Sequence, residues 1–171
     1  MGTDERSITW RGSTVHLSGN EIKAGDKAPD CELLANDLTP VRLSSYQGKI
    51  RIISSIPSLD TPVCDMETRK FNDMAAKMHP DTVILTVSMD LPFAQKRWCG
   101  AAGVDKVVTL SDHRSGEFGR AYGVMIDERR LLARAVFLVD REGRVQYEQV
   151  VGEIADEPDY EAILKALEKI V

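Results

Sequence analysis

The chain has 171 residues, a length that suits one domain built around a single hydrophobic core. Hydrophobic residues make up 43% of the chain and charged residues 29%, values that exclude a collagenous, low-complexity or disordered protein. The net charge of -5 at pH 7 argues against binding to nucleic acid or to anionic lipid. We therefore expect one folded domain over residues 1–171.

Targeting signals and the number of cysteines bear on the cellular compartment of the protein. No apolar run approaches the roughly 20 residues that a membrane span needs, and no secretory signal is visible at the N-terminus. We expect a cytoplasmic protein, with the periplasm still open if an export signal has been removed. The chain has three cysteines, Cys31, Cys64 and Cys99. A secreted disulfide framework normally has more cysteines and an even number of them. The three cysteines of this chain indicate either thiol chemistry or simple packing.

Hydrophobic periodicity and turn residues predict alternating strands and helices. The predicted elements begin with a hairpin of strands 8–10 and 14–17 and a buried strand from residue 50, followed by a helix that starts at Pro62, is capped by Asp60 or Thr61 and stops at His79-Pro80. Next come a strand over 83–87, a short helix over 92–99 closed by Gly100, and a strand over 107–110. A helix over 115–122 ended by Gly123, a second hairpin of strands 133–139 and 145–151, and a helix from Pro158 complete the chain. The order βαβ and then ββα is that of a thioredoxin-like α/β domain. The first hairpin is expected to be an N-terminal extension of about residues 1–18.

Cys64 falls in the first turn of the helix that follows the first central strand. That turn presents unpaired backbone N–H groups and the positive end of the helix dipole, which favour thiolate over thiol. Thr61 is three residues earlier, and its hydroxyl could point at the sulfur or at a bound oxygen. The same position also fits a cysteine that only packs in the core.

Two familiar thiol motifs are absent around Cys64. Thr61 stands where a CxxC pair would have its first cysteine, so the motif of a dithiol oxidoreductase is missing. The spacing from Cys64 to Arg69 is one residue too short for a phosphatase loop, which leaves Arg69 as a surface or supporting residue. His16, His79 and His113 show no metal-ligand spacing, so we expect no metal site.

A family resemblance rests on two longer segments. Residues 57–64, PSLDTPVC, together with residues 68–72, TRKFN, closely resemble the active-site segment of the thiol peroxidase branch of the peroxiredoxins. Residues 90–100, DLPFAQKRWCG, are similar to the segment that carries the second cysteine of this family. The resemblance covers about residues 19–171. It implies an atypical 2-Cys enzyme that reduces hydrogen peroxide and small organic hydroperoxides.

The resemblance also implies roles for particular residues. Cys64 matches the peroxidatic cysteine, which becomes a sulfenic acid, and Cys99 matches the resolving cysteine that closes an intramolecular disulfide with it. Thr61 matches the hydroxyl that orients the peroxide, Pro57 the residue that shields the site from water, and Arg134 the guanidinium that stabilises thiolate and peroxide. The resemblance further implies thioredoxin as electron donor, a homodimer, and no metal, haem or flavin.

Arg134 stands out even without the resemblance. It is the only charge in residues 131–139, LLARAVFLV, a stretch that otherwise predicts a buried strand. A buried cation needs an anionic partner, whereas strand alternation would turn the same side chain to solvent. The pattern alone leaves both possibilities open.

The second and third cysteines give separate expectations. Cys99 lies on its own short helix, and a disulfide with Cys64 requires Cα atoms within about 7 Å. We therefore expect one or both of the two helices to unwind locally during turnover, the short helix of Cys99 being the easier one to open. Cys31 matches neither cysteine role and is expected to pack in the core.

Two other functions remain compatible with this fold class, because the thioredoxin-like architecture hosts several activities. The first is a dithiol reductase or disulfide isomerase, against which the missing CxxC argues. The second is a non-catalytic binding module whose thiols are structural.

Overall fold

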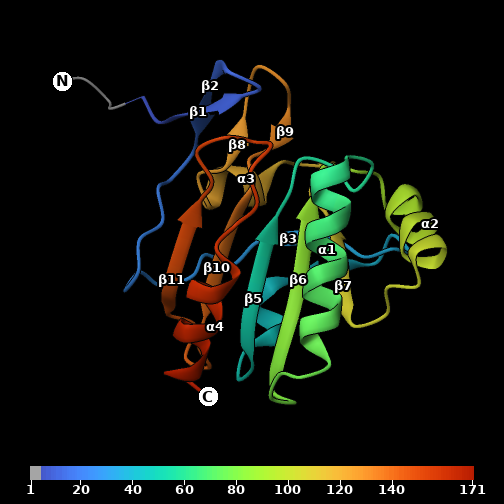
Figure 1. Ribbon diagram of the computed structural model, residues 1–171, viewed down its shortest axis with the longest axis vertical. Coiled ribbons are helices and arrows are strands. Elements are labelled where there is room, and N and C mark those ends of the chain that lie inside the picture. Colours follow the sequence, from blue (N-terminus) through green and yellow to red (C-terminus); the bar gives the residue numbers. More distant parts are fainter. Residues whose placement is uncertain (1–4) are drawn as a thin grey trace.

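The protein is described by a computed structural model over residues 5–171 (Figure 1). Its strands are β1 (Ser7–Trp10), β2 (Ser13–Ser18), β3 (Glu32–Leu34), β4 (Pro40–Arg42), β5 (Ile50–Ser55), β6 (Thr82–Ser88), β7 (Val107–Ser111), β8 (Met125–Ile126), β9 (Leu131–Leu132), β10 (Ala135–Val139) and β11 (Val145–Val150). Its helices are a 3-10 turn, η1 (Leu43–Tyr46), and α1 (Pro62–Ala75), α2 (Pro92–Ala102), α3 (Glu117–Ala121) and α4 (Tyr160–Glu168). Among residues 5–171, no helix is both long and apolar enough to cross a bilayer.

The central sheet has the strand order β11-β10-β5-β6-β7-β3-β4. Strands β5, β6 and β7 are parallel, and α1 connects the first two, so the predicted βαβ unit is confirmed. The predicted C-terminal hairpin is also confirmed, because β10 pairs antiparallel with both β11 and β5. The α/β fold class expected from the element order is therefore present.

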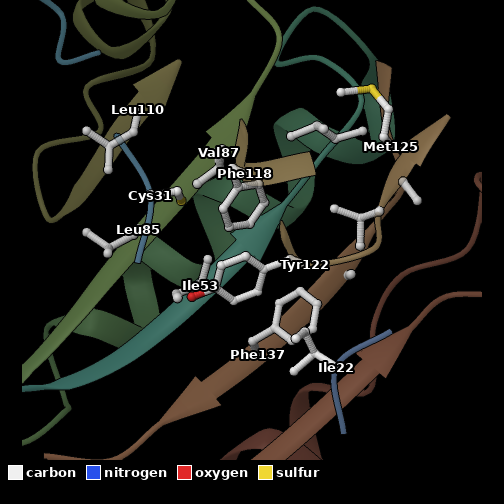
Figure 2. Packing of buried hydrophobic residues seen from close by; sticks show 14 of the residues in the cluster. Ile22, Cys31, Ile53, Leu85, Val87, Leu110, Phe118, Tyr122, Met125 and Phe137 are labelled. Atoms are coloured by element: carbon white, nitrogen blue, oxygen red, sulfur yellow. The ribbon is translucent and has the colours of Figure 1, made fainter. Parts of the chain in front are cut away.

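Both faces of this sheet are buried. Figure 1 shows α1 and α4 on the near face of the sheet. Ile52 and Val136 belong to the buried cluster that also includes Phe71 of α1 and Ile163 of α4. The neighbouring residues Ile53 and Phe137 point to the opposite face and lie beside Tyr122, as Figure 2 shows. The ring of Tyr122 stacks in turn on Phe118 of α3. The alternation follows from the two-residue period of a strand, which sends successive side chains to opposite faces.

The predicted N-terminal hairpin exists as β1 and β2, but it is more closely integrated than a simple extension. β2 pairs with β8, and β8 pairs with β9, so the hairpin belongs to a second sheet of four strands. Ile8 and Val15 are buried against the rest of the molecule. Glu153, in the loop after β11, accepts hydrogen bonds from the Thr9 hydroxyl and from the backbone N–H of Arg11. The hairpin is thereby bound to the loop beside the functional site.

The C-terminal ends of α1 and α2 differ from the prediction. α2 does not stop at Gly100 but continues to Ala102, and the left-handed Gly103 (φ 67°) ends it. Glycine is tolerated inside a helix and becomes a terminator only where the chain needs positive φ, which the sequence does not reveal. α1 ends at Ala75, before the expected stop at His79-Pro80, and the N–H of Lys77 bonds to the Met74 carbonyl in a tighter turn.

Candidate active site

The site forms where the carboxyl end of β5 leads into the first turn of α1. Thr61 is the N-cap residue and Pro62 follows it, and Cys64 lies two residues further on. The first intrahelical bond runs from the Asp65 N–H to the Thr61 carbonyl, so the Cys64 N–H precedes the helical hydrogen-bond pattern. The Cys64 side chain has no exposed surface. The predicted position of this thiol, in the first turn of the helix, is confirmed.

Arg134 reaches the sulfur from the segment just before β10. Its Nη2 donates a hydrogen bond to Cys64 Sγ at 3.4 Å and another to the Ile154 carbonyl at 2.9 Å, while its Nε donates to the same carbonyl at 3.1 Å. Its Nη1 donates to Glu67 Oε2 at 2.5 Å. The Arg134 side chain is only 2% exposed. Of the two possibilities left open by the sequence, the structure shows the buried one.

The electrostatics of this guanidinium follow from its partners. Burial by itself would lower the pKa of Arg134, but the neighbouring Cys64 and Glu67 outweigh burial, and the pKa is raised above its ordinary value. Arg134 therefore presents a fixed positive charge to Cys64 in a site removed from water.

Glu67 belongs to this buried cluster, although the sequence pattern did not single it out. Its carboxylate is fully buried and accepts hydrogen bonds from Arg134 and, at 3.1 Å, from the Ser54 hydroxyl. Burial raises the pKa of Glu67, and the hydrogen bonds and charge of Arg134 oppose that effect. The signal was available, because Glu67 and Phe71 follow Cys64 at helical spacings of three and seven residues and so share its buried face.

A small pocket of about 70 Å³ opens beside this cluster. Pro57, Thr61 and Arg134 line it together with Trp10, Arg11, Pro62, Val63, Ile154 and Ala155. Within the described residues, its wall does not include Cys64. The Thr61 hydroxyl donates to the Ser58 carbonyl at 2.9 Å rather than to the sulfur. It accepts no hydrogen bond from the N–H groups of the first turn, so Thr61 is the N-cap residue by position and not by side-chain bonding. Its oxygen retains lone pairs that can accept a hydrogen bond.

The structure does not bring Cys99 to this cluster. Cys99 is half-buried on α2, and its Sγ lies 3.6 Å from the Thr109 hydroxyl on β7. Its neighbour Trp98 packs against Cys64 instead. All three cysteines are free thiols. Cys31 is fully buried in the core seen in Figure 2, and burial raises the pKa of its thiol, so its predicted packing role is confirmed.

Known proteins resemble this chain over most of its length. The profile of the redoxin family matches residues 23–164. A thiol peroxidase of Halalkalibacterium halodurans is 55% identical over 160 residues, which cover 94% of this chain and 96% of the relative. A thiol peroxidase of Staphylococcus aureus is 53% identical over 163 residues, covering 95% and 98%. The chain belongs to the redoxin family and to its thiol peroxidase branch.

Solved structures of related proteins have the same fold as this redoxin. A peroxiredoxin-like protein from Aquifex aeolicus superposes with a TM-score of 0.91 at 40% identity, covering 97% of this chain and 98% of the other. A thiol peroxidase from Chromobacterium violaceum superposes with a TM-score of 0.87 at 20% identity, covering 98% of each chain. The thioredoxin-like fold of peroxiredoxin type, expected from the sequence, is confirmed.

Proposed function

We propose that this thiol peroxidase reduces hydrogen peroxide and small organic hydroperoxides through Cys64. The observation that carries the proposal is the hydrogen bond from the buried guanidinium of Arg134 to the sulfur of Cys64, with Glu67 and the Ile154 carbonyl holding that guanidinium in place. A nucleophilic sulfur needs to be a thiolate, and the positive charge favours that form.

In the proposed first step, the Cys64 thiolate attacks one oxygen of the peroxide and the O–O bond breaks. The attacked oxygen stays on sulfur as a sulfenic acid, and the other oxygen leaves with the bonding electron pair and takes a proton to become water or an alcohol. Arg134 stabilises the charge that develops on the leaving oxygen. The Thr61 oxygen accepts a hydrogen bond from the peroxide, since its own proton is donated to Ser58. Pro57 shields the pocket from water.

In the second step, the Cys99 thiol attacks the sulfenic sulfur and releases water, which leaves a disulfide between Cys64 and Cys99. Because Cys99 now faces Thr109, α2 must unwind before the two sulfurs meet. A dithiol protein of the thioredoxin class then reduces the disulfide by thiol–disulfide exchange, and we propose thioredoxin itself as the donor. We also propose a homodimer, to be checked by light scattering.

One equivalent of hydrogen peroxide, followed by mass spectrometry of the peptides, tests this scheme. We expect a disulfide between Cys64 and Cys99 in the wild type, and no peroxide consumption by Cys64→Ser. Cys99→Ser should stop at a sulfenic acid that dimedone traps, and Cys31→Ser, the matched control, should behave like the wild type. Recovery of Cys64 as an unmodified thiol from the wild type would overturn the proposal. So would an insulin-reducing activity that exceeds the peroxidase activity.

A further inference from the structure

Three side chains join α1 to α2 next to the site. The indole Nε1 of Trp98 donates a hydrogen bond to Asp65 Oδ1 at 2.9 Å, and Asp65 Oδ2 accepts from Arg69 Nε at 2.9 Å. The guanidinium of Arg69 lies 5.6 Å from the centre of the Trp98 ring. Its Nη1 also donates to the backbone carbonyl of Ala102, the last residue of α2, at 3.2 Å. Together these contacts connect the helix of Cys64 to the helix of Cys99.

We propose that Asp65, Arg69 and Trp98 form a latch that keeps Cys99 folded into α2 and sets the rate at which it attacks the Cys64 sulfenic acid. These three are positioning residues, because none of them exchanges atoms with the peroxide. The proposal rests on the proposed function, in which Cys99 resolves the sulfenic acid.

The geometry of α2 explains why the latch must open. Successive residues of an α-helix point about 100° apart, so Trp98 and Cys99 face different neighbours. Trp98 packs on Ile56, Leu59 and Cys64, whereas the Cys99 sulfur faces Thr109. Cys99 cannot turn towards Cys64 while the adjacent indole stays bound to Asp65.

The latch also responds to movement of α1. Asp65 directly follows Cys64, so unwinding the first turn of α1 to release the sulfenic acid withdraws the acceptor of the Trp98 indole. Opening from either helix breaks the same hydrogen bond. The two segments should therefore open together rather than one after the other.

The opposite end of α2 has an independent anchor. The side-chain amide of Gln95 donates to the Ser88 hydroxyl at 3.0 Å and to the Leu110 carbonyl at 2.9 Å, and Gln95 is fully buried. Opening the latch therefore frees the part of α2 from about Lys96 to Gly103 and leaves its first turn on the sheet. This limits the unwinding to the turns that carry Cys99.

The speed of opening determines the fate of the sulfenic acid. A second peroxide converts a waiting sulfenic acid to sulfinic acid, with the release of water or an alcohol, and that product is not reversed by thiols. The longer the latch stays closed, the more of this product forms. The latch thus sets how sensitive the enzyme is to excess peroxide.

Trp98→Phe tests the latch, since phenylalanine keeps a ring in the same space but cannot donate to Asp65. Stopped-flow mixing with peroxide, followed by acid quenching and mass spectrometry, separates sulfenic acid formation from disulfide formation. We expect disulfide formation to become about tenfold faster, as for the loss of a hydrogen bond to a charged group, with less sulfinic acid at high peroxide. The rate of the first step should stay within about twofold of the wild-type rate, because the latch does not touch the peroxide pocket.

Two further variants keep the test decisive. Arg69→Ala removes the bond to Ala102 from an exposed position, so it should fold and should accelerate disulfide formation to a smaller extent. Arg97→Ala, an exposed residue of the same helix, should leave both rates unchanged. Unchanged or slower disulfide formation in Trp98→Phe and Arg69→Ala would overturn the latch. If wild-type protein formed no disulfide at all, the proposed function itself would fail, which is a different result.

Discussion

At the scale of single residues, the pair of Arg134 and Glu67 is costly to bury, because both side chains give up water and are at most 2% exposed. Apolar side chains would stabilise the fold at least as well. The pair instead fixes the position of the Arg134 guanidinium. Glu67 and the Ile154 carbonyl hold the guanidinium so that Nη2, which bonds to that carbonyl, also donates to the Cys64 sulfur.

Glu67→Gln tests this effect. The change leaves Arg134 without its buried counter-charge, so we expect the reduced protein to lose about 3 kcal/mol of unfolding free energy. We also expect slower sulfenic acid formation, because the guanidinium is less well held. Urea unfolding and stopped-flow peroxide consumption measure the two effects. Glu161→Gln, which removes an exposed carboxylate from α4, should change neither. A Glu67→Gln protein as stable as the wild type would contradict the assigned role.

At the scale of elements, the β1–β2 hairpin and the loop after β11 support each other. Trp10 and Arg11 of the hairpin line the pocket, and the loop supplies the Ile154 carbonyl that holds Arg134. Glu153 connects the two, since its carboxylate accepts hydrogen bonds from Thr9 and from the Arg11 N–H. These bonds lower the pKa of Glu153, the Thr9 hydroxyl contributing most.

Glu153→Ala should therefore loosen the hairpin without unfolding the central sheet. We expect faster amide hydrogen exchange in β1 and β2 and unchanged exchange in β5 and β6. Mass spectrometry of peptides after deuterium labelling would show this pattern. Glu142→Ala, an exposed change in the β10–β11 turn, serves as the control. Equal protection of the hairpin in all three proteins would show that Glu153 does not hold it.

Some elements could be predicted from the sequence and others could not. The βαβ unit, both hairpins and the place of Cys64 could be predicted, since each depends on local periodicity and turn residues. The pairing of β2 with β8 could not, because two-residue strands such as β8 carry no periodic signal. Glu67 was missed for a different reason. A charged residue on a helix is normally solvated, and its burial depends on Arg134, 67 residues away in the chain.

At the scale of the whole molecule, the central sheet has a buried cluster on each face, and a carboxylate lies at the edge of one of them. Asp112 is 2% exposed, and its oxygens accept the N–H groups of Phe118 and Gly119. Burial outweighs these bonds and raises the pKa of Asp112 from an ordinary value of 3.8 to about 6. The native fold thus binds a proton at Asp112 more tightly than the unfolded chain does.

This preference makes stability depend on pH with a definite sign. The contribution of Asp112 is complete below pH 3.8 and is lost as the pH rises through 6, with a total change of up to about 3 kcal/mol. An asparagine side chain at this position would stay neutral throughout, so Asp112→Asn should gain stability relative to the wild type as the pH rises from about 4 to about 7. Urea unfolding of both proteins across that range measures the difference. A constant difference would mean that Asp112 titrates normally.

The complete burial of the Cys64 side chain has a practical consequence for competing reagents. The pocket beside Arg134 holds only about 70 Å³, so a molecule that approaches the sulfur from this side is selected by its cross-section as well as by its reactivity. A two-oxygen oxidant is narrow enough to be admitted after a slight side-chain displacement, whereas a bulky alkylating agent meets the half-buried Cys99 first. The folded chain thereby discriminates between electrophiles that a bare thiolate would attack without distinction.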